Sequence, residues 1–207
     1  MSAVGVGGGT GEHQRERSLV STALGEHDVN MFFWPPRPGV VSQEFASGMR
    51  SFASSSDREN VFLVGCSLSG TRVPGDAELT AFTGRSAEGT QSDLATCLRQ
   101  LGGLSYIDAL IVQYVQPEED FETVLAALAE AQRLKGRGSV RYVGASTHSF
   151  PLARRLIESG MLDVVMLRYN MAHVRGEREA FDCATGALLT SDQLLVVPTL
   201  RVMMHSC

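Results

Sequence analysis

The chain has 207 residues, of which 43% are hydrophobic and 20% are charged, and its formal net charge at pH 7 is −5. This balance is typical of a folded globular protein and excludes wholesale disorder. The net negative charge, with arginines scattered along the chain, argues against a nucleic-acid partner.

The sequence shows no pattern that directs it to a membrane or to secretion. No apolar run reaches the ~18 residues that a membrane helix needs, and the amino-terminal stretch lacks the basic start and apolar core of a secretory signal. The four cysteines lie far apart and form no Cys-x-x-Cys pair, so neither a zinc site nor a small disulfide scaffold is predicted. We therefore expect a reduced, cytoplasmic protein without a bound metal or a membrane partner.

Short apolar runs alternate with amphipathic stretches along the chain. Strands are predicted in the glycine-rich start and at 29–34, 61–66, 107–115, 140–146, 162–169 and 194–200. Helices are predicted at 15–24, 41–52, 94–101, 121–128, 149–160 and 176–188. Several strand-like runs are apolar almost throughout, as is typical of parallel strands covered on both faces. The alternation predicts a single α/β domain over residues 1–207, and a doubly wound sheet and a (β/α)8 barrel both fit it.

The glycine-rich run at 5–11 invites comparison with phosphate-binding loops. It lacks the lysine that follows the last glycine of a P-loop, and Thr10 stands where a dinucleotide-binding fingerprint has its third glycine. We interpret the run as a mobile amino terminus or turn.

Candidate functional residues follow the predicted strands, because the carboxyl ends of parallel strands face the active site in α/β proteins. His148 comes just after strand 140–146, and its imidazole is suited to proton transfer near neutral pH. A cap on the next helix, or a bond to the backbone, explains this position equally well. Gln113 and Tyr114 end another strand and would line the mouth of a barrel.

Other polar residues have structural explanations that compete with functional ones. Arg168 could bind an anion through its planar guanidinium, but a structural ion pair is slightly favoured. Cys66 would be a nucleophile only if a base lowered its pKa, so a buried spectator is the better interpretation. The acidic run 118–120 precedes a helix and is interpreted as a complement to the helix dipole. His205 is placed in a frayed tail.

Three segments of the chain resemble the middle of an aldo-keto reductase. They read LRQLGGLSYIDALIVQYV (98–115), GRGSVRYVGASTHSFPLARRL (136–156) and DVVMLRYNMAHVRGERE (163–179), and their order and spacing match the family. The resemblance implies an α/β fold, a (β/α)8 TIM barrel of aldo-keto reductase type that lacks its last β/α unit. It also implies an NADP(H)-dependent carbonyl or aldehyde oxidoreductase.

The residues that the family uses for catalysis are replaced here. In the family a tyrosine donates a proton to the carbonyl, an aspartate and a lysine tune that tyrosine, and a histidine orients the substrate. The corresponding positions fall on Phe33 for the aspartate, near Pro38 for the tyrosine, on Cys66 for the lysine and on Gln113 for the histidine. The only lysine is Lys135, and no tyrosine precedes position 106.

Three functions remain open. The chain could be an oxidoreductase with an atypical acid such as His148, in which Gln113 and Cys66 occupy catalytic positions. It could be a pseudoenzyme that binds a small molecule or a protein. The weakest alternative is a non-redox barrel enzyme that uses His148.

By resemblance, the NADP(H)-binding positions fall on the following residues: Ser146, Thr147, Met166, Thr199 and Arg201. The expected lining of a ligand pocket adds four more: Trp34, Tyr114, Arg168 and Asn170. A seven-stranded barrel would leave exposed sheet edges, so a homodimer that covers the open edge is an expected partner besides a small-molecule ligand.

Overall fold

The computed structural model describes residues 5–7, 22–23, 30–35, 47–50, 56–70, 85–168, 195–196 and 201–205. Within these ranges, side chains are described for residues 22–23, 30–35, 47–50, 58–70 and 85–167.

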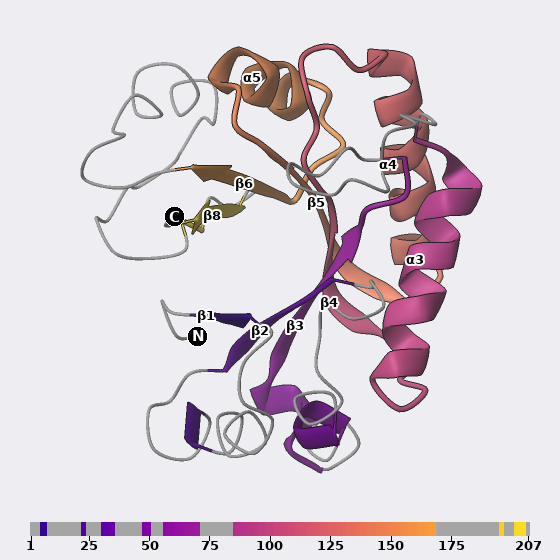
Figure 1. The fold of residues 1–207 in the computed structure, drawn as a ribbon, viewed down its shortest axis with the longest axis vertical. Helices are drawn as coiled ribbons and strands as arrows, with labels where there is room; N and C mark the ends of the chain where they lie inside the picture. The colour runs from indigo at the N-terminus through magenta and orange to yellow at the C-terminus, as the bar shows by residue number, and fades with distance from the viewer. Residues whose placement is uncertain are drawn as a thin grey trace, which may run out of the picture.

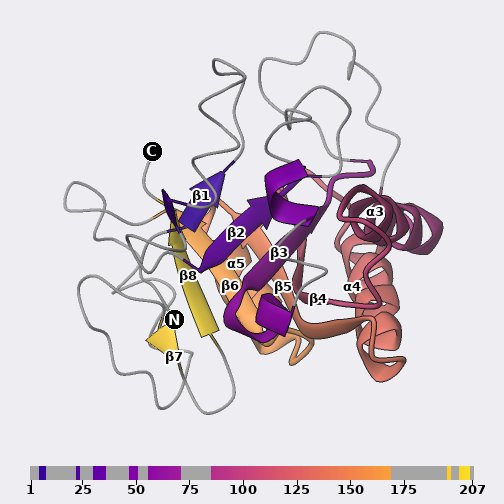
Figure 2. The same cartoon turned by 90° about the horizontal axis from the view of Figure 1, so that it is seen from below.

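A curled sheet of parallel strands forms the centre of the molecule (Figure 1, Figure 2). Its strands are β1 (Gly5–Gly7), β2 (Met31–Trp34), β3 (Phe62–Ser67), β4 (Ile107–Val112), β5 (Val140–Thr147), β6 (Val164–Arg168), β7 (Leu195–Val196) and β8 (Arg201–His205). They pair in the order β1-β2-β3-β4-β5-β6-β8-β7, and only the β7–β8 pair is antiparallel. Among the described strands, no pairing joins the two ends of this order. The sheet is therefore a half-barrel.

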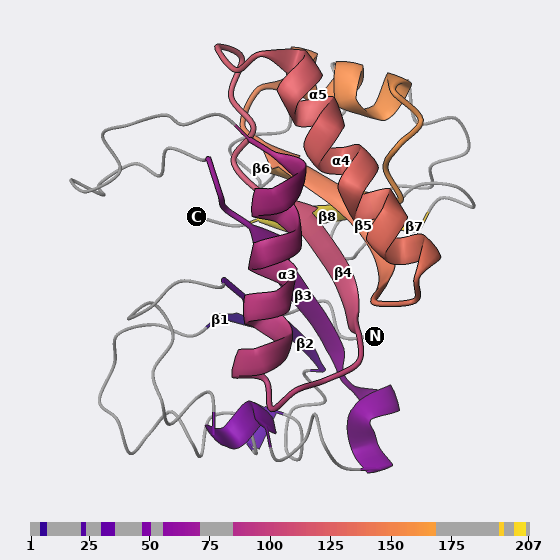
Figure 3. The same ribbon diagram turned by 90° about the vertical axis from the view of Figure 1, so that its right-hand side faces the viewer.

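Helices cover the convex face of the half-barrel. They are α3 (Ala87–Gln100), α4 (Phe121–Gly136) and α5 (Phe150–Glu158), and a short 3-10 helix η1 (Ser56–Asn60) precedes β3. Figure 3 shows α3 and α4 side by side over β3, β4 and β5. Each helix begins at a capping side chain, Ser86, Asp120 or Ser149, whose oxygen accepts a backbone N–H of the first turn.

The alternation of side chains along the strands separates two apolar clusters. The larger one lies between the sheet and the helices. The smaller one lies on the concave face, where Val64, Ala109, Ile111 and Val164 are buried. Gly144 belongs to this face, and a Cβ atom there would lie 2.6 Å from Ile111 Cδ1 and 2.7 Å from the carbonyl oxygen of Val164. Glycine is therefore needed where β4, β5 and β6 curl tightly.

A charge cluster around the buried Asp108 carboxylate lies at the amino ends of β3, β4 and β5. The Asp108 carboxylate accepts hydrogen bonds from Arg58 Nη2 (2.7 Å), Arg141 Nη1 (3.0 Å) and the backbone N–H of Leu63 (2.9 Å). Both guanidinium groups also lie over the Tyr106 ring, 4.2 and 4.4 Å from its centroid. These contacts join three strands through one carboxylate.

The single lysine lies at this end of the sheet too. Lys135 Nζ, near the end of α4, contacts both carboxylate oxygens of Asp163 at 2.7 and 2.6 Å. Asp163 also accepts the backbone N–H of Val143 at 2.9 Å, so the pair ties α4 to β5 just before β6. Lys135 remains one-third exposed.

The predicted α/β barrel is confirmed, and five of the predicted strands correspond to β2 through β6. The glycine-rich start contributes the short strand β1. The seventh predicted strand, 194–200, is described only at residues 195–196, which form the short antiparallel β7. The strand that pairs in parallel with β6 is β8, which lies after the predicted run. His205 therefore ends a strand, opposite Arg168, and the prediction of a frayed tail is wrong.

Candidate functional site

A hollow opens at the carboxyl ends of β4, β5 and β6. It is a shallow hollow, and its space of about 250 Å³ includes open solvent. Its lining residues come from the ends of these strands and the loops that follow them: Gln113, Tyr114, Ser146, Thr147, His148, Met166 and Leu167. Six of these seven are residues that the sequence singled out from three separate segments. The hollow is therefore the candidate site.

The loop after β4 is hydrogen-bonded to the strands on both of its sides. The Gln113 N–H donates to the carbonyl of Ser67 at the end of β3 (3.1 Å), and the Val115 N–H donates to the carbonyl of Ser146 in β5 (2.8 Å). Between them, the Tyr114 N–H donates to Ser146 Oγ (2.9 Å). This part of the hollow is fixed by the backbones of two strands.

Tyr114 has an unusual backbone conformation. Its φ is +55°, and it is the one residue other than glycine with a positive φ in the described part of the chain. A bulky side chain is disfavoured in the left-handed region, and strain of this kind gathers at functional sites. The Tyr114 carbonyl accepts from Gln116 Nε2 at 3.2 Å, so hydrogen bonds hold the residue from both sides.

A buried ion pair is hydrogen-bonded to the same loop. Arg85, just before α3, donates from Nε to Glu119 Oε2 at 2.6 Å and from Nη2 to Glu119 Oε1 at 3.1 Å, and both side chains are 1% exposed. Arg85 Nη2 also donates to the carbonyl of Gln113 (2.7 Å), while Glu119 Oε1 accepts the N–H of Gln116 (2.8 Å). The ion pair thus fixes the loop at two of its residues.

The interpretation of the acidic run 118–120 as a complement to the helix dipole was wrong for Glu119. Asp120 does serve the helix, because its carboxylate caps α4. Glu119 instead pairs with Arg85, which lies 34 positions earlier in the sequence. No local pattern signals a pair of this kind, because its two members come from different β/α units.

His148 lies at the exposed rim of the hollow. Its ring approaches the Tyr114 ring edge-on, with 5.7 Å between the ring centroids and 78° between the planes. The alternative that His148 caps the next helix is wrong, because Ser149 is the N-cap of α5 and accepts the N–H of Leu152. Thr147 Oγ1 accepts the N–H of Ser149 (3.1 Å) and is buried behind the rim.

Cys66 does not line the hollow. It is fully buried in β3, and burial raises the pKa of its thiol well above the ordinary value, with the nearby Cys97 and Asp93 adding to the effect. The thiol is therefore protonated at neutral pH, as expected for a buried spectator rather than a nucleophile.

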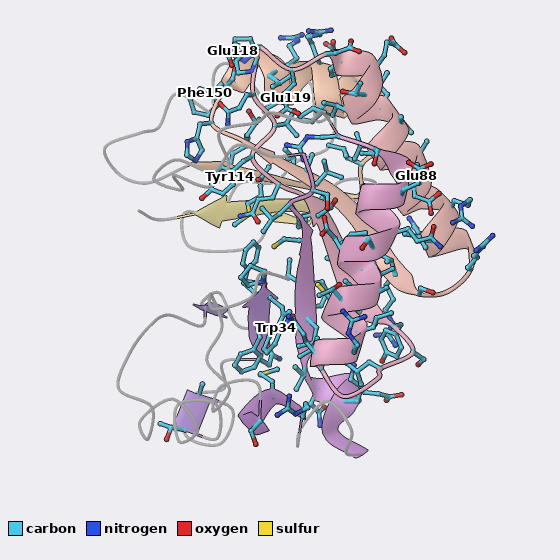
Figure 4. The ribbon with its side chains drawn as sticks, turned by 45° about the vertical axis from the view of Figure 1, so that its right-hand side comes forward. Trp34, Glu88, Tyr114, Glu118, Glu119 and Phe150 are labelled. Atoms are coloured by element: carbon cyan, nitrogen blue, oxygen red, sulfur yellow. The ribbon has the colours of Figure 1, made fainter. Side chains whose placement is uncertain are left out.

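Trp34 was expected in the pocket and is found elsewhere. It is 1% exposed, and its indole Nε1 donates to Gln100 Oε1 at the end of α3 (2.9 Å). Successive residues of a strand face opposite sides, so Phe33 lies on the concave face while Trp34 lies against the helices. Figure 4 shows Trp34 beside α3, whereas Tyr114 lies near β6 and β8.

Arg201 is the first residue of β8. Its backbone pairs with Val164, the first residue of β6, whereas the hollow lies at the carboxyl end. Arg168 ends β6 at the expected edge, but its side chain lies outside the described part of the structure. Pro38, Asn170 and Thr199 also lie outside the described residues.

Two other kinds of site are absent from the described ranges. No group of three or more histidine, cysteine, aspartate or glutamate side chains there is placed to hold a metal ion. No helix there combines the length and the apolarity needed to cross a membrane.

Known proteins were then compared with the chain and its fold. The chain is 26% identical over 105 residues to the NADH-specific methylglyoxal reductase of Escherichia coli (strain K12), a match that covers 51% of this chain and 31% of that reductase. The fold resembles the crystal structure of an aldo/keto reductase from Brucella melitensis, with a TM-score of 0.61, 16% identity, and coverage of 87% of this chain and 66% of that one.

A second solved structure, of a Pseudomonas aeruginosa protein provisionally assigned to the same family, gives a TM-score of 0.66 at 20% identity over 88% of this chain and 69% of that one. This chain thus spans about a third of the length of the curated relative and about two-thirds of these solved structures. The sequence model of the aldo/keto reductase family matches residues 48–185, which is more than half of the chain. The chain therefore belongs to the aldo/keto reductase family.

Proposed function

We propose that this chain binds a reduced nicotinamide dinucleotide and a small carbonyl compound at the hollow, and that it reduces the carbonyl to an alcohol. One observation carries the proposal. Gln113, Ser146 and Met166, which correspond by resemblance to the family's substrate and cofactor positions, line a single hollow together with His148. Its place at the carboxyl ends of the strands is where parallel α/β barrels hold their ligands.

The lining of the hollow fits a nicotinamide ring. Met166 and Leu167 supply an apolar wall, and the polarizable thioether of Met166 suits contact with a flat ring. Ser146 Oγ accepts the N–H of Tyr114, which leaves its hydroxyl proton available for a carboxamide oxygen. When bound, the dinucleotide would supply the hydride, and Ser146 and Gln113 would orient its ring and the carbonyl compound.

The choice between NADH and NADPH is part of the proposal. NADP(H) is the expectation from the family resemblance, whereas the matched Escherichia coli reductase is described as NADH-specific. Both dinucleotides are therefore to be compared. An α-oxoaldehyde such as methylglyoxal, the substrate in that relative's name, is the first carbonyl compound to assay.

A non-catalytic binding protein is the second candidate function. Two positions that carry catalytic residues in the family, here Phe33 and Cys66, have surroundings that favour it. Phe33 packs on the concave apolar cluster, and burial keeps the Cys66 thiol protonated. Neither position offers the acid–base chemistry of the family.

Thermal unfolding with and without each dinucleotide tests the proposal. A ligand present at ~100 times its Kd stabilises the folded state by about 2.7 kcal/mol, which would raise the midpoint by several degrees. Saturable stabilisation, followed by oxidation of the dinucleotide when a carbonyl compound is added, is the expected result. Binding without turnover would instead favour the binding protein, and no stabilisation by either dinucleotide would refute the proposed function.

A further inference from the structure

We propose that Tyr114, beside His148, is the proton donor for carbonyl reduction at the hollow. This inference rests on the proposed function and replaces the family's tyrosine with one from a different loop. It follows from the position, the strained backbone and the ring contact of Tyr114.

The first observation is the position of the phenol. Tyr114 is half-buried in the lining of the hollow, directly after Gln113. Gln113 is 9% exposed, and its amide can orient a carbonyl oxygen but carries no ionisable proton. A tyrosine hydroxyl does carry one, and it can transfer that proton to a carbonyl oxygen as negative charge develops there. Within the described lining, Tyr114 and His148 are the two side chains with an ionisable proton.

The second observation is the way in which the backbone holds this residue. Glycine adopts a φ of +55° without steric cost, whereas tyrosine does not. Ser146 Oγ and Gln116 Nε2 nevertheless hold Tyr114 in that conformation, and the Arg85–Glu119 pair holds the residues on either side. The loop is therefore fixed around an unfavourable conformation that places Tyr114 in the lining of the hollow. Strain that is maintained by its surroundings marks a residue kept for its side chain.

The third observation is the partner ring. His148 is exposed to solvent and meets the Tyr114 ring edge-on at 5.7 Å. The contact comes from the loop after β5, so two loops meet at this pair of rings. His148 thus places an exposed imidazole beside the Tyr114 ring in the lining of the hollow, where protons can exchange with water.

When bound, the reduced dinucleotide would supply a hydride, with its two electrons, for the carbonyl carbon. Tyr114 would transfer its phenolic proton to the carbonyl oxygen, which would leave an alcohol, the oxidised dinucleotide and a Tyr114 phenolate. The phenolate regains its proton from solvent at the open mouth beside His148.

Tyr114→Phe removes only the hydroxyl group and keeps the ring against His148. We expect kcat to fall ~100-fold or more, the range that general acids typically supply, while the Kd of the reduced dinucleotide stays within about twofold. Tyr142→Phe is the matched control. It removes the same atom from a ring that stacks on Phe62, 6.1 Å away, and lies outside the hollow.

Infrared spectroscopy provides a readout that does not depend on turnover. The probe is ¹³C-labelled benzaldehyde, bound to the protein in the presence of the oxidised dinucleotide, which cannot reduce it. Hydrogen bonding to the phenol should lower the carbonyl stretching frequency in the wild-type protein and in Tyr142→Phe, but not in Tyr114→Phe.

Equal frequencies in the wild-type protein and Tyr114→Phe, or equal kcat in Tyr114→Phe and Tyr142→Phe, would overturn the inference and leave the proposed function standing. Failure of the wild-type protein to bind either dinucleotide would refute the proposed function, and the proton-donor role with it. His148→Gln, which keeps polar atoms near the phenol but cannot carry a charge, should lower kcat ~10-fold. A Tyr114→Phe protein with unchanged thermal midpoint would show that the loss of kcat is not a loss of folding.

Discussion

The two ends of the sheet use charged and aromatic residues in opposite ways. At the amino end, one carboxylate accepts hydrogen bonds from two guanidinium groups and a backbone N–H, and both cations lie over the Tyr106 ring. At the carboxyl end, a tyrosine with a strained backbone and an exposed histidine line an open hollow. Similar side chains join neighbouring strands at one end and line a hollow at the other. Composition alone does not separate these two roles, whereas the position of the residues along the strands does.

The Arg85–Glu119 pair combines both roles, because it is a buried ion pair that also holds the loop of the hollow. Arg85→Leu would leave the Glu119 carboxylate buried without its cation. We expect a loss of about 4 kcal/mol in the free energy of unfolding, within the range known for broken buried ion pairs. Urea denaturation measures it. In the double variant Arg85→Leu/Glu119→Leu the loss should be smaller, and a loss equal to the sum of both single variants would contradict the pairing.

Asp108 tests the amino end by itself. Asp108→Ala would remove the shared acceptor of Arg58, Arg141 and the Leu63 N–H, so we expect the free energy of unfolding to fall by about 3 kcal/mol. The dinucleotide affinity of the folded protein should not change, because the site lies at the other end of the strands. A large loss of affinity measured by titration below the unfolding transition would break the proposed division between the two ends.

Tyr114→Gly sharpens the comparison at the carboxyl end. Glycine accepts the φ of +55°, so relief of strain should offset the lost ring contact and leave the free energy of unfolding within about 1 kcal/mol of the wild-type value. Tyr142→Gly, in an ordinary strand and stacked on Phe62, should cost clearly more. Chemical denaturation of the two variants side by side measures the difference, and equal losses would show that Tyr114 is not strained.

The smallest expected effect is a pH dependence on the surface of α4. The side-chain hydrogen bond from Arg133 lowers the pKa of Glu130, so the carboxylate form is favoured in the folded state. This contribution is present above the ordinary glutamate pKa and is lost as the pH falls through the lower folded value. Arg133 is 38% exposed, so we expect less than about 1 kcal/mol. Glu130→Gln should flatten this part of the acid unfolding curve, and an unchanged curve would contradict the assignment.

Much of the fold could be predicted because the strand-forming runs are apolar and regularly spaced. The sequence does not show which residues of β2 face the helices and which face the concave side, because all four are apolar: Met31, Phe32, Phe33 and Trp34. Trp34 was therefore assigned to the pocket and found against α3. The apolar run 194–200 was likewise predicted as the seventh strand, whereas β8 begins at Arg201.

The candidate site was predicted where it depends on strand ends and missed where it depends on contacts between distant segments. Gln113 and His148 were singled out near the ends of predicted strands, and Ser146 was singled out by the family resemblance; all three line the hollow. The Arg85–Glu119 pair and the positive φ of Tyr114 have no such local signal. Both arise only once β3, β4 and β5 are adjacent.

Lys135 allows the molecule to be labelled selectively. It is the only lysine in the sequence, one-third exposed, and lies near the end of α4 at the amino edge of the sheet. Apart from the chain's own amino terminus, amine-directed reagents have this single target, and it lies at the opposite edge from the hollow. A dye or surface tether attached there would report on ligand capture without obstructing the mouth of the site.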